Sequence, residues 1–284
     1  MVEVVLGVDG GGSGCRAALC DAAGRVLGRG TGGPANATSD FDGTCASVGA
    51  AIAGALAEAG LTEGKIAGGV LGLAGLRYPA QAEAMIARLA LRQCTVTEDR
   101  PTVMAGALGG ADGAVAALGT GSFVGVVRGG ETRAVGGWGL QVSDVASAAW
   151  IGRAGLAATL EAVDGMQESG AMARALLDRW GSDADAIVDF AATARPVDYG
   201  ALAPVVTAAA QDDPAAAAIM RAAAGWIDRA LVALGHDDGL PVVMTGGTGA
   251  AVQPWLARPG RVFRAPAGSA LDGALLLARR ATWG

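Results

Sequence analysis

One block of sequence occurs twice in this chain and limits its fold more than any other feature. Each copy reads as an apolar strand, a turn of small residues, a second strand, a glycine hairpin and a third strand, at about 4–29 and about 114–135. The first copy contains the turn Asp9-Gly-Gly-Gly-Ser13, and the second contains Gly119-Thr-Gly-Ser122. The distance between the copies is far too long for a solenoid repeat, so the pattern predicts a duplicated domain.

Outside these copies the chain alternates between helix and strand. After the first copy we expect helices at about 41–59, 80–91 and 102–108, and strands at 66–73 and 94–97. After the second copy we expect helices at about 145–162, 171–180, 184–192, 200–210 and 214–234, a strand at 241–245 and a last helix from 269. Strands that alternate with helices predict an α/β fold with a largely parallel sheet.

Composition and charge exclude several classes of protein. Apolar residues make up 52% and charged residues 17% of the 284 residues, which suits buried cores and not a disordered chain. The net charge of −6 and a single lysine, Lys65, argue against a nucleic-acid partner and against a basic membrane anchor. The chain enters its first strand without a basic leader, and charged residues break its alanine-rich stretches. We therefore expect no secretion signal and no membrane span.

The cysteines and the one histidine bear on metal and redox chemistry. Cys15, Cys20, Cys45 and Cys94 form no Cys-x-x-Cys pair, and His236 is the only histidine. Zinc and iron–sulfur sites are therefore poorly supported. A reduced, cytoplasmic setting is the simplest expectation.

The turn Asp9-Gly-Gly-Gly-Ser13 has the composition of a phosphate-binding loop. Glycines let backbone N–H groups approach phosphate oxygens, and Ser13 adds a hydroxyl donor. Asp9 could hold Mg²⁺ through water, since Mg²⁺ keeps several waters when a carboxylate binds it. The alternative is an ordinary glycine-rich hairpin, and a single such loop is weak evidence.

Two further turns strengthen this interpretation. Gly119-Thr-Gly-Ser122 has the equivalent place in the second copy, where it could bind the same phosphate chain. Thr245-Gly-Gly-Thr-Gly249 follows a strand, and the carboxyl end of a parallel strand is a usual place for a nucleotide. The alternative for this third turn is a strand-to-helix connection with Thr248 as the N-cap.

Other phosphate-transfer and hydrolase motifs are missing from the sequence. Lys65 lies in no Walker-type loop, and there is no His-Arg-Asp or Asp-Phe-Gly signature. There is also no Gly-x-Ser-x-Gly elbow. The chemistry must then rest on backbone amides, hydroxyls, carboxylates and Mg²⁺.

Four motifs in order carry a resemblance to a known family: Asp9–Ser13, Gly119–Ser122, Gly136-Gly-Trp-Gly139 followed by Asp144, and Gly246-Gly247. With them the chain resembles the BadF/BadG/BcrA/BcrD ATPase family from Val5 to Leu277, and within it bacterial glucosamine and N-acetylglucosamine kinases. The resemblance implies two RNase H-like domains of the actin/hexokinase/Hsp70 type with an ATP cleft between them. We expect these domains at 1–110 and 111–284, with a last helix (about 269–282) that can pack back onto the first domain.

The resemblance also implies roles for individual residues. Asp99 is the expected catalytic base, which accepts or orients the proton of the sugar hydroxyl. The expected sugar contacts are Asn36, Asp99, Ser122, Gly137, Trp138, Gly139 and Asp144. The expected ATP contacts, with Mg²⁺ held by Asp9 through water, are Asp9, Gly10, Gly11, Gly12, Ser13, Arg16, Thr120, Gly121, Gly246 and Gly247.

Each sugar-site assignment has a structural alternative. Glu98 could replace Asp99 as the base, or the segment could be a solvated loop before Pro101. Asn36 could serve only its own turn, and Trp138 could be a core aromatic. Asp144 could be the N-cap of the following helix.

The sequence departs from the family pattern at two places. Arg100-Pro101 follows the expected base, where the family has small residues. Ala146 stands where the family usually has glycine, which narrows the backbone freedom beside Asp144.

The expected activity is ATP-dependent phosphorylation of an amino sugar at its primary hydroxyl, in the cytoplasm. A homodimer is expected from the resemblance alone. One alternative is an ATP-driven activator of a dehydratase, which needs well-placed cysteines for an iron–sulfur cluster. Another is a sugar sensor built on a kinase fold.

Overall fold

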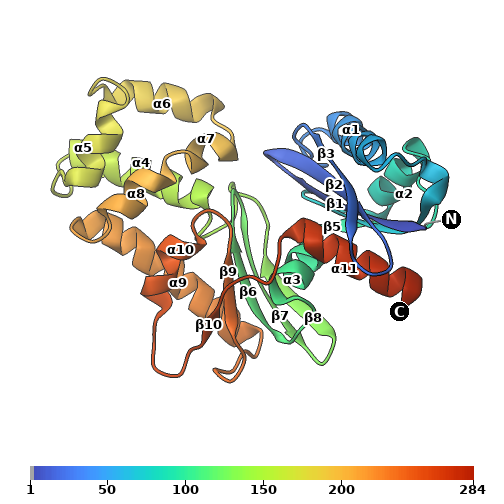
Figure 1. The fold of residues 1–284 in the computed structure, drawn as a ribbon. Helices are drawn as coiled ribbons and strands as arrows, with labels where there is room; N and C mark the ends of the chain where they lie inside the picture. Colours follow the sequence, from blue (N-terminus) through green and yellow to red (C-terminus); the bar gives the residue numbers. More distant parts are fainter. Residues whose placement is uncertain (1–2) are drawn as a thin grey trace. The chain divides into compact units, whose positions relative to one another are not determined.

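The computed structural model describes residues 3–284, which form two compact units. The first unit contains the chain up to Asp112 together with Ala265–Gly284, and the second is the continuous segment Gly113–Arg264. Each unit is built on a five-stranded sheet (Figure 1). The last helix, α11 (Ala270–Trp283), belongs to the first unit.

The sheet of the first unit has the strand order β3-β2-β1-β4-β5. Its strands are β1 (Val4–Gly11), β2 (Gly14–Cys20), β3 (Val26–Gly32), β4 (Ile66–Leu73) and β5 (Cys94–Glu98). The first three pair antiparallel, whereas β4 pairs parallel with β1 and β5 pairs parallel with β4. Its helices are α1 (Phe41–Ala59), α2 (Pro79–Arg88), α3 (Arg100–Leu108) and α11, with a short 3-10 turn η1 (Glu63–Lys65).

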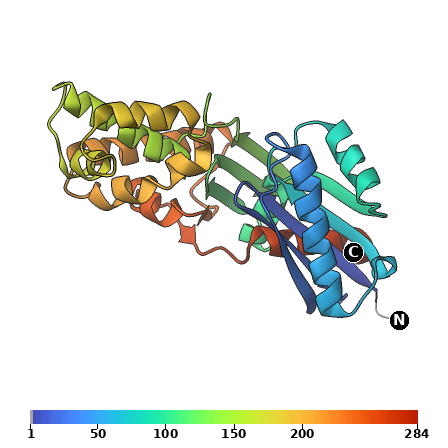
Figure 2. The same ribbon diagram turned by 90° about the horizontal axis from the view of Figure 1, so that it is seen from above.

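Alternation along β1 distributes its side chains between two cores. Leu6 and Val8 share a core with α1 and α2, whereas Val5 shares a core with Leu271 and Leu275 of α11. Helices therefore cover both faces of the sheet, as Figure 2 shows for α1 and α11. Gly28 and Gly30 of β3 lie directly against α1, because an added Cβ at either would meet backbone carbonyls of that helix.

The second unit repeats the topology, with the strand order β10-β9-β6-β7-β8. Its strands are β6 (Gly113–Leu118), β7 (Ser122–Arg128), β8 (Glu131–Gly136), β9 (Val242–Thr245) and β10 (Phe263–Arg264). Strands β6, β7 and β8 are antiparallel neighbours, and β9 pairs parallel with β6. The two copies in the sequence thus form equivalent halves of two sheets, which confirms the predicted α/β fold.

A helical layer lies between β8 and β9 in the sequence and packs on one face of this sheet. It contains α4 (Ala148–Val163), α5 (Ala171–Asp178), α6 (Ala184–Thr193), α7 (Pro196–Gly200), α8 (Ala203–Ala209) and α9 (Pro214–Ala233), while α10 (Gly249–Val252) and η2 (Gln253–Leu256) follow β9. The helix predicted at 200–210 is α8, which begins only at Ala203, and the short helix α7 before it was not predicted. Pro204 lies in the first turn of α8, where a missing N–H costs nothing and starts a new helix.

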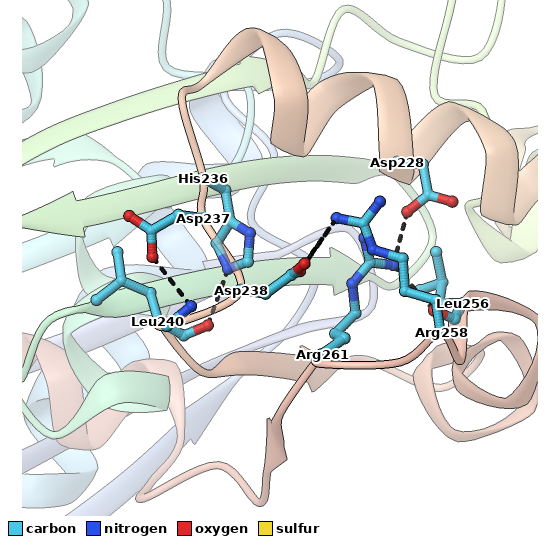
Figure 3. A network of polar contacts seen from close by, with 9 residues as sticks. Asp228, His236, Asp237, Asp238, Leu240, Leu256, Arg258 and Arg261 are labelled. Carbon is cyan, nitrogen blue, oxygen red and sulfur yellow. Dashed lines mark hydrogen bonds and ion pairs between the residues drawn. The ribbon is translucent and has the colours of Figure 1, made fainter.

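Polar contacts hold the loop segments that precede β9 and β10 against each other and against α9 (Figure 3). The His236 Nε2 lies 2.9 Å from the Leu240 carbonyl oxygen, and Arg258 pairs with Asp238 at 3.0 Å. The buried side chain of Arg261 donates to the Leu256 carbonyl and lies 2.6 Å from Asp228. The single histidine thus contacts the loop that leads into β9.

Candidate active site

The first part of the site lies at the carboxyl ends of three parallel strands. Asp9 of β1 is in register with Gly72 of β4, and Gly72 is in register with Thr97 of β5. Asp99 follows the end of β5 two residues after Thr97. Asp9 and Asp99 therefore sit at the same edge of the sheet, on strands that flank β4.

Asp9 faces a cation on the neighbouring strand. It is the antiparallel partner of Arg16, whose guanidinium Nη2 lies 3.0 Å from the Asp9 Oδ2. Burial raises the pKa of Asp9, and the attraction of Arg16 opposes that rise. The Arg16 side chain stays 63% exposed, so it can also reach an anionic ligand.

The residues fit an Mg²⁺ ion held through water. Asp9 offers one carboxylate at a strand end, and no cluster of three acidic, histidine or cysteine side chains that could hold a metal occurs among residues 3–284. A site of this kind suits Mg²⁺, which usually keeps most of its waters.

The glycines of the first turn have two different functions. An added Cβ at Gly10 would collide with Leu73 and Ala35, so this glycine permits close packing. At Gly11 and Gly12 the space is open, and Gly12 and Ser13 are exposed. The tip of this turn is thus uncrowded, and its role as a phosphate loop stays a prediction.

Asp99 is the most strongly perturbed carboxyl group at this edge. Burial raises its pKa to about 6, and the negative charges of Glu98 and Asp9 add to the rise. The Asp99 carboxylate receives no hydrogen bond from another side chain in the described part of the chain. A carboxyl group with a pKa near neutrality is a candidate for a general base.

The departure at Arg100-Pro101 leaves Asp99 as the candidate base. Arg100 donates its Nε–H to Glu98 at 2.9 Å, so it pairs mainly with the neighbouring glutamate. Pro101 lies in the first turn of α3, where it is tolerated. Glu98, the alternative base, is engaged in this ion pair, and Asp99 is the better candidate of the two.

Asn36 lies next to the strand-end carboxylates. It forms an isolated bridge with Ala74, just after β4, and its side-chain oxygen accepts from the amides of Thr38 and Ser39 at 3.1 and 3.3 Å. The turn role is therefore present. The side-chain NH₂ group still has its donors for a sugar hydroxyl.

In the second unit, two of the predicted nucleotide turns pack against each other. The Thr248 amide and hydroxyl both donate to the Leu118 carbonyl, at 3.2 and 3.0 Å. Gly246 has φ +84° and lies so close to Leu118 that an added Cβ would collide with its carbonyl. Thr248 occupies the N-cap position of α10, but its hydroxyl does not cap that helix.

The loop between β8 and α4 completes this part of the site. The Gly139 amide donates to the Asp144 Oδ1 at 3.0 Å, and the same carboxylate lies close to Gly121. The Ser122 side chain is buried and donates to the Val145 carbonyl at 2.7 Å. Ser122 is thus turned inward, whereas the sequence predicts that it contacts the sugar.

The predicted N-cap role of Asp144 is wrong. Ser147 caps α4, because its hydroxyl accepts from the Trp150 amide at 3.0 Å. Asp144 instead has φ +54° and Ala146 has φ +75°, a left-handed region that favours glycine. The alanine that replaces the family's glycine at position 146 is therefore strained, because glycine would adopt this conformation without cost.

Trp138 is not a core aromatic, since 65% of its surface is exposed. It lines an open cavity of about 340 Å³ together with Trp226, Ser143 and Arg229. Sequence reasoning named neither Trp226 nor Arg229, which line this cavity, nor the bond of the Thr248 hydroxyl to Leu118. Trp226 and Arg229 lie on α9, far along the chain from Trp138, and no motif marks them.

The folds and turns define a class of protein: an ATP-binding enzyme of the RNase H-like, actin/hexokinase/Hsp70 type. Two sheets of the same topology each carry a turn of small residues between their first two strands. The chain belongs to the BadF/BadG/BcrA/BcrD ATPase family, whose model matches residues 6–257. The resemblance stated from the sequence is thereby confirmed.

Individual relatives agree with this family. A glucosamine kinase of Vibrio cholerae is 30% identical over 279 residues, which are 96% of this chain and 95% of that protein. A crystal structure from Chromobacterium violaceum, with the provisional name N-acetylglucosamine kinase, is 34% identical, has a TM-score of 0.87 and covers 97% of this chain and 99% of its own. A ROK family glucokinase of Streptomyces griseus, in complex with glucose and AMPPNP, is 21% identical, has a TM-score of 0.58 and covers 98% of this chain and 99% of its own, which shows a shared fold alone.

Proposed function

We propose that this enzyme, a sugar kinase, transfers the γ-phosphoryl group of ATP to the primary hydroxyl of an amino sugar, glucosamine or N-acetylglucosamine. The observation that carries the proposal is Asp99, a carboxyl group with a pKa of about 6 at the same strand edge as the first phosphate turn. The resemblance to named amino-sugar kinases supports the choice of substrate.

Asp99 would act on the sugar hydroxyl. Its carboxylate accepts the hydroxyl proton as the oxygen forms a bond to the γ-phosphorus and the bond to the β-phosphate oxygen breaks. ADP then leaves with the bridging oxygen. A pKa of about 6 keeps Asp99 ionised at neutral pH while it remains basic enough to take the proton.

The two small-residue turns would bind the phosphates. The space around Gly11 and Gly12 is open, and Arg16 carries an exposed positive charge on the next strand. The Gly119–Ser122 turn would offer backbone amides and the Thr120 hydroxyl as further donors. Mg²⁺, held through water by Asp9, would supply charge neutralisation for the transferring group.

The sugar would contact the loop of the second unit around Asp144. The exposed indole of Trp138 offers a flat apolar face for a pyranose ring. Asp144 offers a carboxylate to a sugar hydroxyl or to the ammonium group of glucosamine. Asn36, in the first unit, offers its NH₂ donors.

The alternative role as an iron–sulfur activator gains no support from the cysteines. Cluster ligands are thiolates, but burial raises the pKa of Cys15 to about 12 and that of Cys94 to about 11.

A cytoplasmic location and a homodimer stay predictions. None of the helices in residues 3–284 combines the length and hydropathy that a membrane span requires.

A substrate panel tests the proposal. Purified enzyme with ATP and Mg²⁺ is assayed for ADP release with glucosamine, N-acetylglucosamine, N-acetylmuramic acid and glucose, and the product is examined by mass spectrometry and ³¹P NMR. We expect the highest kcat/KM with one of the first two sugars and a phosphate ester on the primary carbon. ADP release that no sugar stimulates would refute the proposal.

A further inference from the structure

Three peptide groups of the loop 144–148 are bound to the two nucleotide turns of the second unit. The Ser122 hydroxyl donates to the Val145 carbonyl at 2.7 Å, and the Ala148 amide donates to the Gly119 carbonyl at 2.9 Å. The Thr248 hydroxyl lies 3.5 Å from the Ala146 carbonyl oxygen. The loop that carries Asp144 is thus held from the β6–β7 turn and from the turn after β9, which are neighbours in Figure 1.

This loop needs such restraint because its backbone is strained. Asp144 and Ala146 both have positive φ, at +54° and +75°, although neither is glycine. Aspartate adopts this left-handed conformation at a small cost, but the conformation is unfavourable for alanine. A strained backbone of this kind persists only where the surroundings hold it in place.

Thr248 is in the best position to provide that restraint. Its side chain is buried, and its one hydroxyl proton faces two carbonyl oxygens, that of Leu118 at 3.0 Å and that of Ala146 at 3.5 Å. Leu118 immediately precedes the second phosphate turn, and Thr248 itself follows Gly246-Gly247. A single hydroxyl therefore touches the phosphate turn, the adenosine turn and the loop of Asp144.

We propose that Thr248 is a positioning residue that couples nucleotide binding to sugar binding. Its hydroxyl keeps Ala146 in the left-handed conformation and so directs the Asp144 carboxylate. A nucleotide that orders the turn at 246–248 then also orders the sugar loop, and raises the affinity for the sugar. The inference rests on the proposed function, because it takes Gly246-Gly247 as a nucleotide contact and Asp144 as a sugar contact.

Thr248→Val tests the coupling, because valine keeps the shape of threonine and its backbone bond to Leu118 but lacks the hydroxyl. Affinity for the best sugar of the panel is measured by calorimetry with and without AMPPNP. In the wild type, AMPPNP should tighten sugar binding. In Thr248→Val the sugar Kd in the presence of AMPPNP should rise about threefold to tenfold, the size of one lost hydrogen bond, so that the effect of AMPPNP falls by a similar factor. The affinity for AMPPNP alone should stay within about twofold, since the Leu118 bond to the amide remains.

Two controls separate positioning from general stability. Thr159→Val removes another buried hydroxyl in the same unit, which donates to the Gly155 carbonyl at 2.8 Å within α4. This variant should leave unchanged both the sugar Kd and the effect of AMPPNP on it. Thr248→Ser keeps the hydroxyl and should restore both to within about twofold of the wild type.

The outcomes are distinguishable. The role of Thr248 is overturned if AMPPNP tightens sugar binding in Thr248→Val as much as in the wild type. It is also overturned if Thr159→Val loses as much of this effect as Thr248→Val does. Either result leaves the kinase proposal standing. A wild type without sugar-stimulated turnover removes the kinase proposal itself. If Thr248→Val is insoluble, Ser122→Ala removes the other hydroxyl that holds the loop. If Ser122 holds the loop, Ser122→Ala should reduce the effect of AMPPNP on sugar affinity. If Ser122 contacts the sugar directly, the variant should weaken sugar binding equally with and without AMPPNP.

Discussion

At the scale of single residues, Asp99 combines a functional property with a cost in stability. Burial raises its pKa from 3.8 to about 6, so the folded state holds the proton more tightly than the unfolded chain does. The contribution of Asp99 to the free energy of unfolding is therefore most favourable below pH 4 and falls as the pH rises through 6, because the folded protein must then bury a charge. The group that is poised to accept a proton is for that reason destabilising at neutral pH.

Asp99→Asn should consequently stabilise the protein at neutral pH. Replacing the charged group by an amide removes the burial penalty, which amounts to roughly 1–2 kcal/mol after allowance for partial solvent screening. Thermal melts at pH 7.5 should show a higher Tm for the variant, and the two proteins should melt alike near pH 4. A variant that is less stable at pH 7.5 would mean that the carboxylate is satisfied in the folded state.

The same pKa sets the acid limb of the rate profile. Because the carboxylate must be ionised to accept a proton, kcat/KM should fall tenfold per pH unit below about pH 6. Rates measured from pH 5 to 8 at saturating Mg²⁺ check this. A profile that stays flat down to pH 5 would contradict the assignment.

At the scale of elements, two packed helices cross at glycines. An added Cβ at Gly273 of α11 would meet the Thr102 carbonyl and the backbone of Gly106 in α3. Helix propensity alone favours alanine over glycine by about 1 kcal/mol. The contacts here are backbone atoms, which cannot move aside as a flexible side chain could.

Gly273→Ala should therefore destabilise the protein by about 1–3 kcal/mol, the usual cost of overpacking. Gly225→Ala in α9 is the matched control, since the nearest atom to its added Cβ is the far end of Arg229 at 3.6 Å. The control should stabilise by up to about 1 kcal/mol. Urea denaturation gives the free energy of unfolding of both variants. Equal changes in the two variants would contradict the packing argument.

A buried carboxylate joins two helices of the second unit. Asp213 accepts from the Ala215 and Ala216 amides at the start of α9, at 2.9 and 3.1 Å, and from the Met172 amide of α5 at 2.9 Å. It is only 2% exposed. The single side chain thus satisfies amides at two helix starts.

Asp213→Ala should cost about 2–4 kcal/mol, because it leaves three amides, two of them buried, without an acceptor. Asp183→Ala is the control, since that aspartate caps α6 through one amide, that of Asp185. It should cost at most about 1 kcal/mol. Chemical denaturation gives both values, and similar losses would show that Asp213 acts as an ordinary cap.

These elements also show how far sequence reasoning reached. The strands and turns of both copies were predictable, because alternation and glycine turns are local properties. The inward hydroxyls of Ser122 and Thr248 were not, since their acceptors lie 23 and 130 residues away. Asp144 resembled an N-cap in the sequence, but only the backbone shows that Ser147 has this role.

At the scale of the whole molecule, the two units differ in how they are built from the chain. The core of the second unit contains only residues from 114 to 263, one continuous segment. The first unit has two cores, and one of them depends on Leu271, Leu275 and Ala278 of α11. The first unit therefore cannot bury both faces of its sheet until the end of the chain is present.

Fragments test this difference. We expect residues 113–264 to melt cooperatively when expressed alone, because their main core is complete. We expect residues 1–112 to lack a cooperative melt and to bind a hydrophobic dye, since the face that carries Val5 and Val70 stays uncovered. A cooperative melt of 1–112 would contradict the role of α11.

The most direct test of the central claim is sugar-stimulated ADP release by the wild type and by Asp99→Asn, at pH 7.5 with saturating Mg²⁺. We predict that the wild type turns over an amino sugar and that the variant loses about 10²–10⁴-fold in kcat, the usual contribution of a general base. The KM for ATP should change little, because Asp99 is not expected to contact the nucleotide. A variant with the kcat of the wild type would contradict the account.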